Sequence, residues 1–571
     1  MIAKMTQYSF ILMHGDKESF LRELQELGVV DITRSAKPVD SYSQSLLDNI
    51  ATLQHDIACT RAGLDDTLTG LLAKRDEVLQ EMEQNAPWGE YDRERLAPFG
   101  IHYYSCAAKK FDLAWAENWA LQTVTEKDGL VWFVVVGDNA GFPLKELPAP
   151  QHCPSELKPV LEDMDDKIAV HREILESRKE DIPNMERHVR NLQADLDRYL
   201  AGTAAVPAAE DTIDTLVGFA PTECDEAVTR FLDQSGAYYL KNEAKVEENP
   251  PIEFKNNKFV KMFEVLTDMY GRPAYDGFDP TPFIAVFFML FFALCMGDAG
   301  YGLVLILVGL LLRKVPSFKS LAPLVVTLGG ATVVVGFFLH TFFSIDIAQW
   351  KCFEGIRGIF LPDEIAGYAG GMVLSLIVGV VHLCLAMVVK AVNAVRVHGF
   401  SSSLGTLGWT LLIVGGVIVG GIALTGVMSS EVTKWVVIAL GVVSAIGIFP
   451  LNNPKRNKLA NVGLGFWDSY QMVTGLLGDV LSYLRLYALG LAGSMLGMAF
   501  NDMGKMVLGD GSNLVLWVPF ILLVLIGHTL NIAMCALGAF VHPLRLNFLE
   551  FFKNSGYEAA GRRFNPLTNN K

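Results

Sequence analysis

The sequence predicts a mainly α-helical protein: a cytoplasmic dumbbell of two small α/β globules joined by a coiled-coil helical hairpin, followed by a polytopic membrane domain with about eight spans. Three observations predict this fold. Charged residues are frequent before residue 280, whereas Leu, Val, Ile, Phe, Gly and Ala dominate residues 281–552. Two stretches of the first half repeat apolar residues every seven positions, which is typical of coiled coils. Several later segments are long and apolar enough to cross a bilayer.

Two long helices are predicted at about residues 43–90 and 155–202. Their sevenfold repeats are Ile50, Ile57, Leu64, Leu71 and Val78 in the first, and Leu161, Ile168, Leu175, Ile182, Val189 and Leu196 in the second. Two such apolar stripes in one chain indicate that the helices pair with each other. Two ordinary amphipathic helices of a bundle are the alternative, but the pattern persists for about five heptads, which favours the hairpin. Pro183 is expected to kink the second helix.

Short α/β pieces flank and separate these helices. Residues 6–32 and 212–245 each predict a strand, a helix and a second strand, and residues 98–138 contain strand-like apolar runs. The expected domains are cytoplasmic globules with the hairpin at 1–250, including a distal globule at 93–150, a linker at 251–280, a transmembrane domain at 281–552 and a cytoplasmic tail at 553–571.

Several kinds of site are excluded by the sequence. The eight cysteines are scattered without a CxxC pair, so neither a zinc site nor a disulfide framework is indicated. The adjacent pair His152 and Cys153 is expected to be incidental. No phosphate-binding G-x-x-x-x-G-K-[ST] loop occurs, so any ATP is expected on another chain. The net charge of −15 gives no reason to expect nucleic acid. We therefore expect no catalytic site, no cofactor and no metal.

The membrane half contains eight apolar segments, at 281–296, 299–312, 320–346, 368–393, 404–426, 431–450, 467–500 and 514–552. Asp298 lies in the short break between the first two segments and is expected to cap the second rather than to conduct ions. Treating that break as helical gives seven spans instead of eight.

Charge placement favours eight spans. With the first half cytoplasmic, as expected because the N-terminal apolar run is too short for a signal peptide, the excess of Lys and Arg lies inside, as the positive-inside rule requires. The inside charges would be Arg313, Lys314, Lys319, Arg396, Lys455, Arg456, Lys458, Lys553, Arg562 and Arg563, and the outside ones Lys351, Arg357, Lys434 and Lys505, with Asp363, Glu364, Glu431, Asp502 and Asp510 nearby.

The last two apolar segments are longer than a span requires. A helix crosses the hydrocarbon core with about 20 residues, and residues 514–552 would reach about 58 Å at about 1.5 Å per residue. Such helices must tilt, protrude or bend. Two long, tilted helices with polar residues indicate a surface that faces a partner.

Arg485 lies in the middle of the first of these helices, within GDVLSYLRLYALGLAGSML at 478–496. A charge at that depth costs about 2.5–3.5 kcal/mol on insertion scales. Asp479 lies well round the helix, so the arginine has no good carboxylate partner in its own segment. Three explanations remain: a structural arginine within a bundle, a secondary transporter for an anionic solute, and an ion-translocating stator whose arginine meets a carboxylate on a moving partner and lowers its pKa by about 1–3 units.

Four motifs resemble one family. They are SYLRLYALGLA at 482–492, NKFVKMFEVLTDMYGRPAYDGFDPTPF at 257–283, MGDAGYGL at 296–303 and GAFVHPLRLNFLEFF at 538–552. They are similar to the membrane subunit called a or I of rotary V/A-type ATPases, and the first half resembles the cytoplasmic domain of that family. The likeness thus extends over the whole chain.

This resemblance implies a non-catalytic, multi-pass membrane stator that moves H⁺ or Na⁺, expected in a prokaryotic plasma membrane with both termini cytoplasmic. Its implied partners are the proteolipid (c/K) ring, peripheral stalk subunits of E and G type, and indirectly the central stalk cap subunit and the catalytic head. Arg485 would face the ring carboxylate, with Arg545 as the second arginine. Possible half-channel lining is Asp479, Ser482, His528 and Asn531. Eukaryotic members of the family have an acidic residue where this chain has Cys535. In the outer half-channel, His528 or Asn531 is therefore expected to take the place of that acid. A hydrogen bond between packed helices is an equally expected role for His528.

Overall fold

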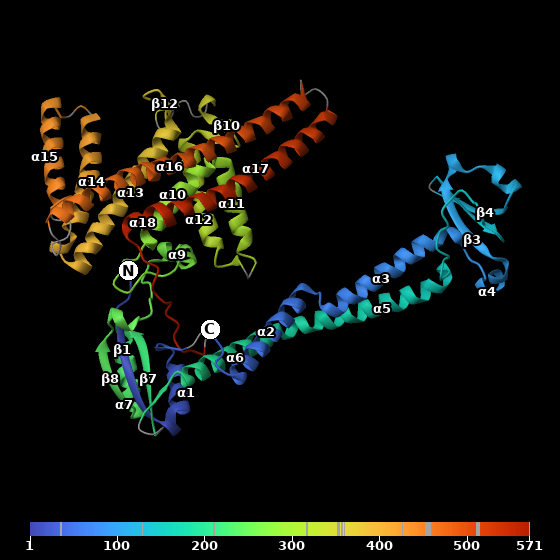
Figure 1. Ribbon diagram of the computed structural model, residues 1–571, viewed down its shortest axis with the longest axis horizontal. Helices are drawn as coiled ribbons and strands as arrows, with labels where there is room; N and C mark the ends of the chain where they lie inside the picture. Colours follow the sequence, from blue (N-terminus) through green and yellow to red (C-terminus); the bar gives the residue numbers. More distant parts are fainter. Residues whose placement is uncertain are drawn as a thin grey trace. The chain divides into compact units, whose positions relative to one another are not determined.

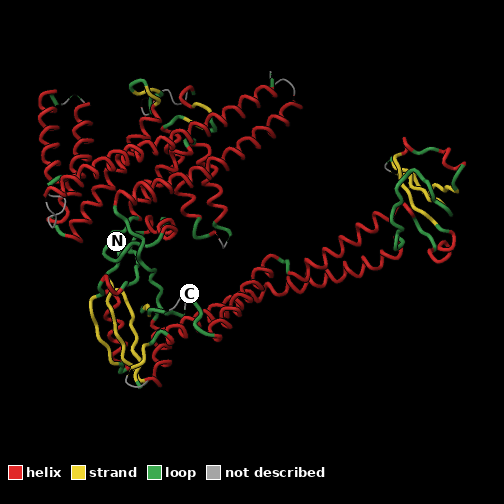
Figure 2. The backbone as a smooth tube through the Cα atoms, in the orientation of Figure 1, coloured by secondary structure: helices red, strands yellow, loops and turns green. Residues whose placement is uncertain are grey.

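The computed structural model describes all residues except 35–36, 128, 209–211, 316–317, 351–354, 356–357, 359, 425, 427, 451–457, 510–513 and 570–571. The chain divides into two compact units. One contains Met1–Phe10 and Val217–Pro566, and the other contains Ile11–Leu216 and Leu567–Lys571. Helices make up most of both units (Figure 2), which confirms the mainly helical prediction.

Two pairs of helices form the elongated part of the second unit (Figure 1). Helix α2 (Ser41–Ala62) packs on α6 (Ile182–Thr203), and α3 (Asp66–Asn85) packs on α5 (Pro154–Arg178). The predicted heptad residues form their apolar contacts: the two clusters include buried Ile50, Ile57, Ile168, Leu175, Val189 and Leu196. The apolar stripe was therefore predicted correctly.

Both long helices are interrupted, which the repeats did not predict. Gly63 ends α2 in the left-handed conformation at φ 66°, and Asp65 caps α3 by accepting a hydrogen bond from Leu68 N at 2.8 Å. The 3₁₀ turn Lys179–Asp181 separates α5 from α6. Pro183 stands in the first turn of α6, where its missing N–H costs nothing, so the expected kink is instead a helix start. Leu64 lies in the interruption and is 45% exposed.

A three-stranded antiparallel sheet lies between α3 and α5 in the chain. Its order is β3 (Ile101–Ala107), β5 (Leu130–Val136), β4 (Ala120–Lys127), with Tyr104 opposite Phe133. Helix α4 (Arg93–Leu96) precedes it. Tyr104, Phe133 and Val135 form its core, so the expected strand-like runs at 98–138 are confirmed.

The larger sheet has the strand order β2-β7-β1-β8, with β6 paired to β7. Its elements are β1 (Met5–Met13), α1 (Lys17–Leu27), β2 (Asp31–Ile32), β6 (Val206–Ala208), β7 (Ile213–Pro221), α7 (Asp225–Ser235) and β8 (Tyr238–Glu243). The strand–helix–strand predictions for residues 6–32 and 212–245 are confirmed.

The apolar half of the chain is helical. After the short helices α8 (Lys258–Lys261) and α9 (Glu264–Tyr270) come α10 (Thr281–Met296), α11 (Ala299–Leu312), α12 (Ala322–Phe338), α13 (Gly370–His398), α14 (Leu404–Leu424), α15 (Ser430–Ile448), α16 (Lys458–Leu508), α17 (Trp517–Arg545) and α18 (Phe552–Ser555). Within the described residues, five apolar stretches are long enough to span a membrane, and α10, α11 and α12 are shorter apolar helices.

Asp298 separates α10 from α11 and caps α11, as predicted. Gly297 ends α10 at φ 58°, and the Asp298 carboxylate accepts from Gly300 N at 2.8 Å and Tyr301 N at 3.2 Å. The same carboxylate accepts from Phe343 N at 2.9 Å and Ser344 N at 2.5 Å, in the turn between β9 (Thr341–Phe342) and β10 (Ile345–Asp346). Four backbone donors thus converge on one buried acid. A second hairpin pairs β11 (Glu364–Ile365) with β12 (Tyr368–Ala369).

Helices α16 and α17 pack against each other and run obliquely to α14 and α15 (Figure 1). At 51 residues, α16 exceeds the predicted segment 467–500. Helix α17 continues into the π-helical turn Leu546–Phe551 and α18. Of the loop charges used to count spans, Lys351, Arg357, Lys455, Arg456 and Asp510 lie outside the described residues.

Candidate functional site

Arg485 lies near the middle of α16 and is half-buried. Its Nη1 atom is buried and has no hydrogen-bond partner, although a buried guanidinium normally uses its five donors. No ion pair joins Arg485 or Arg545 to any carboxylate in the described part of the chain. Arg545 ends α17 and is exposed. Both guanidinium charges act on His542, whose buried Nδ1 also has no partner, so the two arginines share one neighbourhood.

Tyr483 fixes the orientation of α16 around Arg485. The Tyr483 side chain is fully buried, and its hydroxyl lies 2.9 Å from His382 Nδ1 on α13. The His382 ring stacks on Phe551 with a centroid distance of 4.8 Å. Gly379 lets the ring approach, since a Cβ there would overlap Tyr483. These contacts tie α13, α16 and the π-helical turn together.

Asp479, six residues before Arg485 on α16, belongs to an acidic cluster that also includes residues after α17. Asp479 accepts from Asn554 Nδ2 at 2.7 Å and pairs with Lys553 Nζ at 3.3 Å. Ser482 donates to Gly478 O at 3.1 Å and lies beside the Glu550 carboxyl. Glu550 is buried, and its Oε2 has no hydrogen-bond partner. The predicted residues Asp479 and Ser482 are thus brought together with an acid that was not among the predicted site residues.

A second polar cluster lies on the other side of Arg485 and joins α11, α16 and α17. The Tyr301 hydroxyl lies 2.8 Å from His528 Nδ1 and accepts from Asn531 Nδ2 at 2.8 Å. Asn531 also donates to Gly493 O at 2.8 Å, and His528 Nε2 lies 3.0 Å from Asn501 Oδ1. The predicted residues His528 and Asn531 therefore share a buried network whose central member, Tyr301, was not predicted.

Cys535 belongs to the same network, because its thiol lies 3.4 Å from Asn531 Oδ1. Every hydrogen bond in the network is made within the chain, and both ring nitrogens of His528 are occupied. The network therefore rigidly connects three helices.

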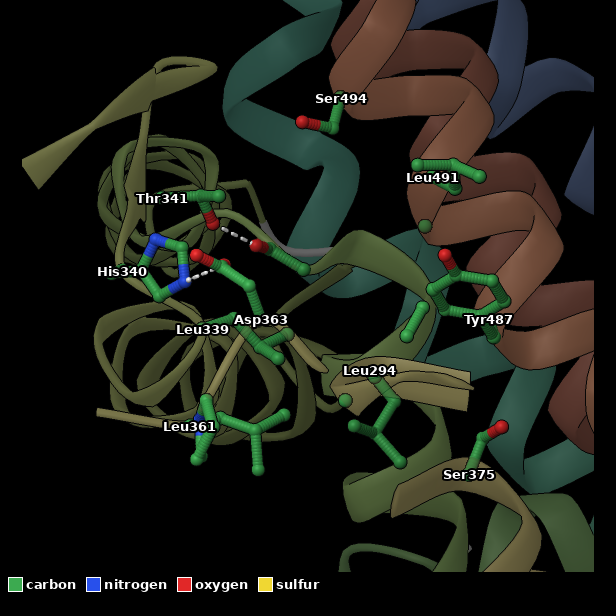
Figure 3. A pocket seen from close by; sticks show the side chains of 16 residues that line it. Leu294, Leu339, His340, Thr341, Leu361, Asp363, Ser375, Tyr487, Leu491 and Ser494 are labelled. Carbon is green, nitrogen blue, oxygen red and sulfur yellow. Dashed lines mark hydrogen bonds and ion pairs between the residues drawn. The ribbon is translucent and has the colours of Figure 1, made fainter. Parts of the chain in front are cut away.

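A cavity of about 230 Å³ lies beside this part of α16 (Figure 3). Tyr487, Leu491 and Ser494 of α16 face it from one side, and Leu294 and Ser375 lie across from them (Figure 3). The β9–β10 and β11–β12 region closes the remaining side. The cavity lining is mostly apolar and includes the hydroxyl groups of Thr341, Ser375, Tyr487 and Ser494.

His340 lies at the loop side of this cavity and faces two carboxylates. Its Nδ1 lies 3.0 Å from Asp346 Oδ1, and its Nε2 lies 3.2 Å from Asp363 Oδ1. The imidazole thereby links the two hairpins. No cluster of His, Cys, Asp and Glu suited to a metal ion occurs among the residues that the structure describes.

Comparisons with known proteins agree on one family. The model of the V-type ATPase 116 kDa subunit family matches residues 155–317 and 471–569. The A-type ATP synthase subunit I of Methanocaldococcus jannaschii is 33% identical over 353 residues, which is 57% of this chain and 50% of that protein. The chain therefore spans about half the length of this archaeal relative.

Two spirochaete relatives align over more of the chain. The V-type ATP synthase subunit I 1 of Treponema pallidum is 27% identical over 86% of this chain and 83% of its own length. The V-type ATP synthase subunit I of Borreliella burgdorferi is 24% identical, and the alignment covers 99% of each protein. The matched range 471–569 contains both arginines and the cluster residues from Asp479 to Asn554, and the range 155–317 contains Tyr301.

Proposed function

We propose that these matches identify the chain as a membrane subunit of the V/A-type ATPase subunit I family. On that premise, we propose that it is the non-catalytic stator through which a rotary ATPase moves H⁺ or Na⁺. The observation that supports this proposal best is Arg485, whose buried Nη1 has no partner in the described part of the chain. A carboxylate arriving on a proteolipid ring would pair with the charge of this half-buried side chain. Because the arginine does not deprotonate, it repels cations between two aqueous paths instead of relaying them.

The proposed ion path has two halves that meet at Arg485. Asp479, Ser482 and Glu550 would line the cytoplasmic half, since Glu550 offers an acceptor without a partner. The cavity beside Tyr487 and Ser494 would form the outer inlet. His528 and Asn531 would line the outer half at the network described above, and Arg545 would act as the second arginine.

The remaining architecture is part of the same proposal. We infer eight spans, formed by the five long stretches and the three shorter apolar helices, in a prokaryotic plasma membrane with both termini cytoplasmic. Residues 1–250 would form a dumbbell with two globules and hold peripheral stalk subunits of E and G type. Residues 251–280 would link it to the transmembrane domain at 281–552, and 553–571 would be a cytoplasmic tail. The central stalk cap subunit and the catalytic head would be indirect partners.

The decisive experiment replaces Arg485 in the assembled complex. Arg485→Gln is expected to abolish ATP-driven ion pumping in reconstituted vesicles, whereas the detached catalytic head keeps its ATPase activity. The matched control is Arg396→Gln, which removes an exposed arginine at the end of α13 and is expected to leave pumping unchanged. Full pumping by the Arg485→Gln complex would refute the proposal. Uptake of an anionic solute by vesicles containing this chain alone would favour a secondary transporter instead.

A further inference from the structure

The buried polar network on α11, α16 and α17 continues beyond His528 into the β9–β10 turn. His528 Nε2 lies 3.0 Å from Asn501 Oδ1, and Asn501 Nδ2 donates to Phe343 O at 2.9 Å. The peptide group that contains this carbonyl also contains the Ser344 N–H, which donates to Asp298 Oδ2 at 2.5 Å. The network therefore ends on a carboxylate. All of these residues belong to one compact unit.

Backbone carbonyls fix the orientation of both asparagine side chains in this network. A carbonyl oxygen only accepts hydrogen bonds, so Asn501 must turn its Nδ2 to Phe343 O, which leaves its Oδ1 to face the imidazole. By the same reasoning, Asn531 must turn its Nδ2 to Gly493 O. The second hydrogen of this Nδ2 is donated to the Tyr301 hydroxyl at 2.8 Å.

These orientations determine where His528 holds its proton. Asn501 Oδ1 has no hydrogen to donate, so the Nε2 atom that faces it must have one. In the neutral ring, Nδ1 is then unprotonated and accepts a hydrogen bond. The Tyr301 hydroxyl accepts from Asn531, and its own hydrogen is free to be donated to Nδ1 at 2.8 Å. A doubly protonated ring would present a second N–H to this hydroxyl, whose hydrogen would then need another acceptor.

The donors of the whole chain of hydrogen bonds point in one direction, from the Cys535 thiol on α17 to the Asp298 carboxylate. Hydrogen bonds in such a chain polarise one another, and a negative charge at the accepting end favours this direction. We propose that Tyr301 is a positioning residue whose hydroxyl holds His528 as the neutral tautomer with its proton on Nε2. The chain of bonds thereby connects the β9–β10 turn to α16 and α17.

This assignment has a consequence for the ion path, which rests on the proposed function. The network lines the outer half with fixed dipoles and does not relay protons. The side-chain amides of Asn501 and Asn531 interrupt it, because an amide has no proton that it exchanges as an acid or base. The ion therefore passes beside the network, through the cavity next to Tyr487 and Ser494.

The test is solid-state NMR of the imidazole nitrogens in the purified full chain in lipid bilayers at pH 7. Gly527 and His528 form the only Gly–His pair of the sequence, so carbonyl-labelled glycine combined with labelled histidine identifies His528 without a mutation. Wild type is expected to show one set of signals, with Nε2 protonated and Nδ1 unprotonated and hydrogen-bonded. The opposite tautomer, a mixture of tautomers or an imidazolium would overturn the proposal.

Two variants test the role of the neighbours. Tyr301→Phe removes the donor to Nδ1, whose resonance is expected to shift to that of a ring nitrogen without a hydrogen bond. Asn501→Leu removes the acceptor of the Nε2 proton and is expected to populate the tautomer with the proton on Nδ1. Tyr368→Phe is the matched control, because Tyr368 of β12 is 61% exposed, and is expected to change neither signal.

The result decides the proposal even where one variant does not fold, since the wild-type signals and either variant test it separately. A Nδ1 resonance in Tyr301→Phe equal to that of wild type would refute the positioning role, and so would a single unchanged tautomer in Asn501→Leu. The measurement contains neither ATP nor a ring, so its failure leaves the proposed stator function untouched.

Discussion

Removing the Asp298 carboxylate is expected to loosen the contact between α11 and the β9–β10 hairpin. Three of its four backbone donors, Gly300, Tyr301 and Phe343, use Oδ1, and Ser344 uses Oδ2. Phe343 and Ser344 have φ values of 47° and 57°, which non-glycine residues rarely adopt. The carboxylate therefore stabilises a turn that its own residues disfavour.

The magnitude follows from the number of hydrogen bonds. Bonds to a charged group contribute about 1.5–3 kcal/mol each, so four give an upper bound of about 6–12 kcal/mol because bonds to one carboxylate are not independent. We expect Asp298→Ala to lower the free energy of unfolding by about 4 kcal/mol. Asp298→Asn keeps Oδ1 and loses the bond from Ser344, which is expected to cost about 2 kcal/mol.

The assay is SDS-induced unfolding of the purified chain in micelles, followed by far-UV circular dichroism. Hydrogen exchange provides a local readout, because the amides of Phe343 and Ser344 are expected to lose protection in Asp298→Ala. Asp502→Ala removes an exposed carboxylate of a surface ion pair and is expected to cost under about 1 kcal/mol. Equal stability of the Asp298→Ala and Asp502→Ala variants would refute the reasoning.

Three further substitutions test other parts of the structure. Leu175 occupies a heptad position and is 2% exposed, so Leu175→Ala is expected to lower the free energy of unfolding by about 2–5 kcal/mol in a thermal unfolding experiment. Leu64→Ala, in the helix interruption, is expected to change it by under about 0.5 kcal/mol. Similar values for both variants would contradict the heptad assignment. Gly302→Ala places a Cβ 2.6 Å from Val333 N and is expected to separate α11 from α12, whereas the Cβ added by Gly330→Ala meets nothing within 4 Å. Gly302→Ala is therefore expected to unfold at a lower SDS concentration than Gly330→Ala, and equal stability of the two variants would refute this. The Leu68 N–H, together with His171, holds the pKa of the Asp65 carboxyl below its usual value. This contribution to stability is therefore present above about pH 4 and is lost as the pH falls through the lower native pKa. Asp65→Asn keeps a side chain that can cap α3 but removes the ionisable group. It is therefore expected to weaken the loss of amide protection in α3 that hydrogen exchange detects as the pH falls below about 4. An unchanged pH dependence would contradict this role of Asp65.

The heptads predicted which faces of the two helix pairs meet, because buried residues such as Ile168 and Leu175 repeat at the coiled-coil period. The interruption was missed although its signals are present. Gly63 supplies the left-handed end of α2, and Asp65 supplies the cap of α3, as these residue types commonly do. The prediction of two unbroken helices followed the persistent apolar period and disregarded these two local signals.

At the candidate site, charge within an apolar helix was enough to select Arg485, whereas Asp479 and Ser482 were selected by their polarity and their position near it. Tyr301 was out of reach of such reasoning, since it meets His528 across 227 positions of sequence and only tertiary packing brings them together. Glu550 lies in the π-helical turn after Arg545. The wider turn shifts side chains away from the 3.6-residue period on which face assignments depend.

The interruption of the helix pairs has a mechanical consequence. The two interruptions, at 63–65 and Lys179–Asp181, lie close to each other in the paired helices, since Asp65, Arg178 and Asp181 line one cavity. An unbroken coiled coil spreads a bending load along its whole length, but a rod without continuous helix in either member bends first at that level. A sideways force on the three-stranded sheet is therefore expected to bend the helix pairs there first, and the work of bending would be stored there as elastic energy.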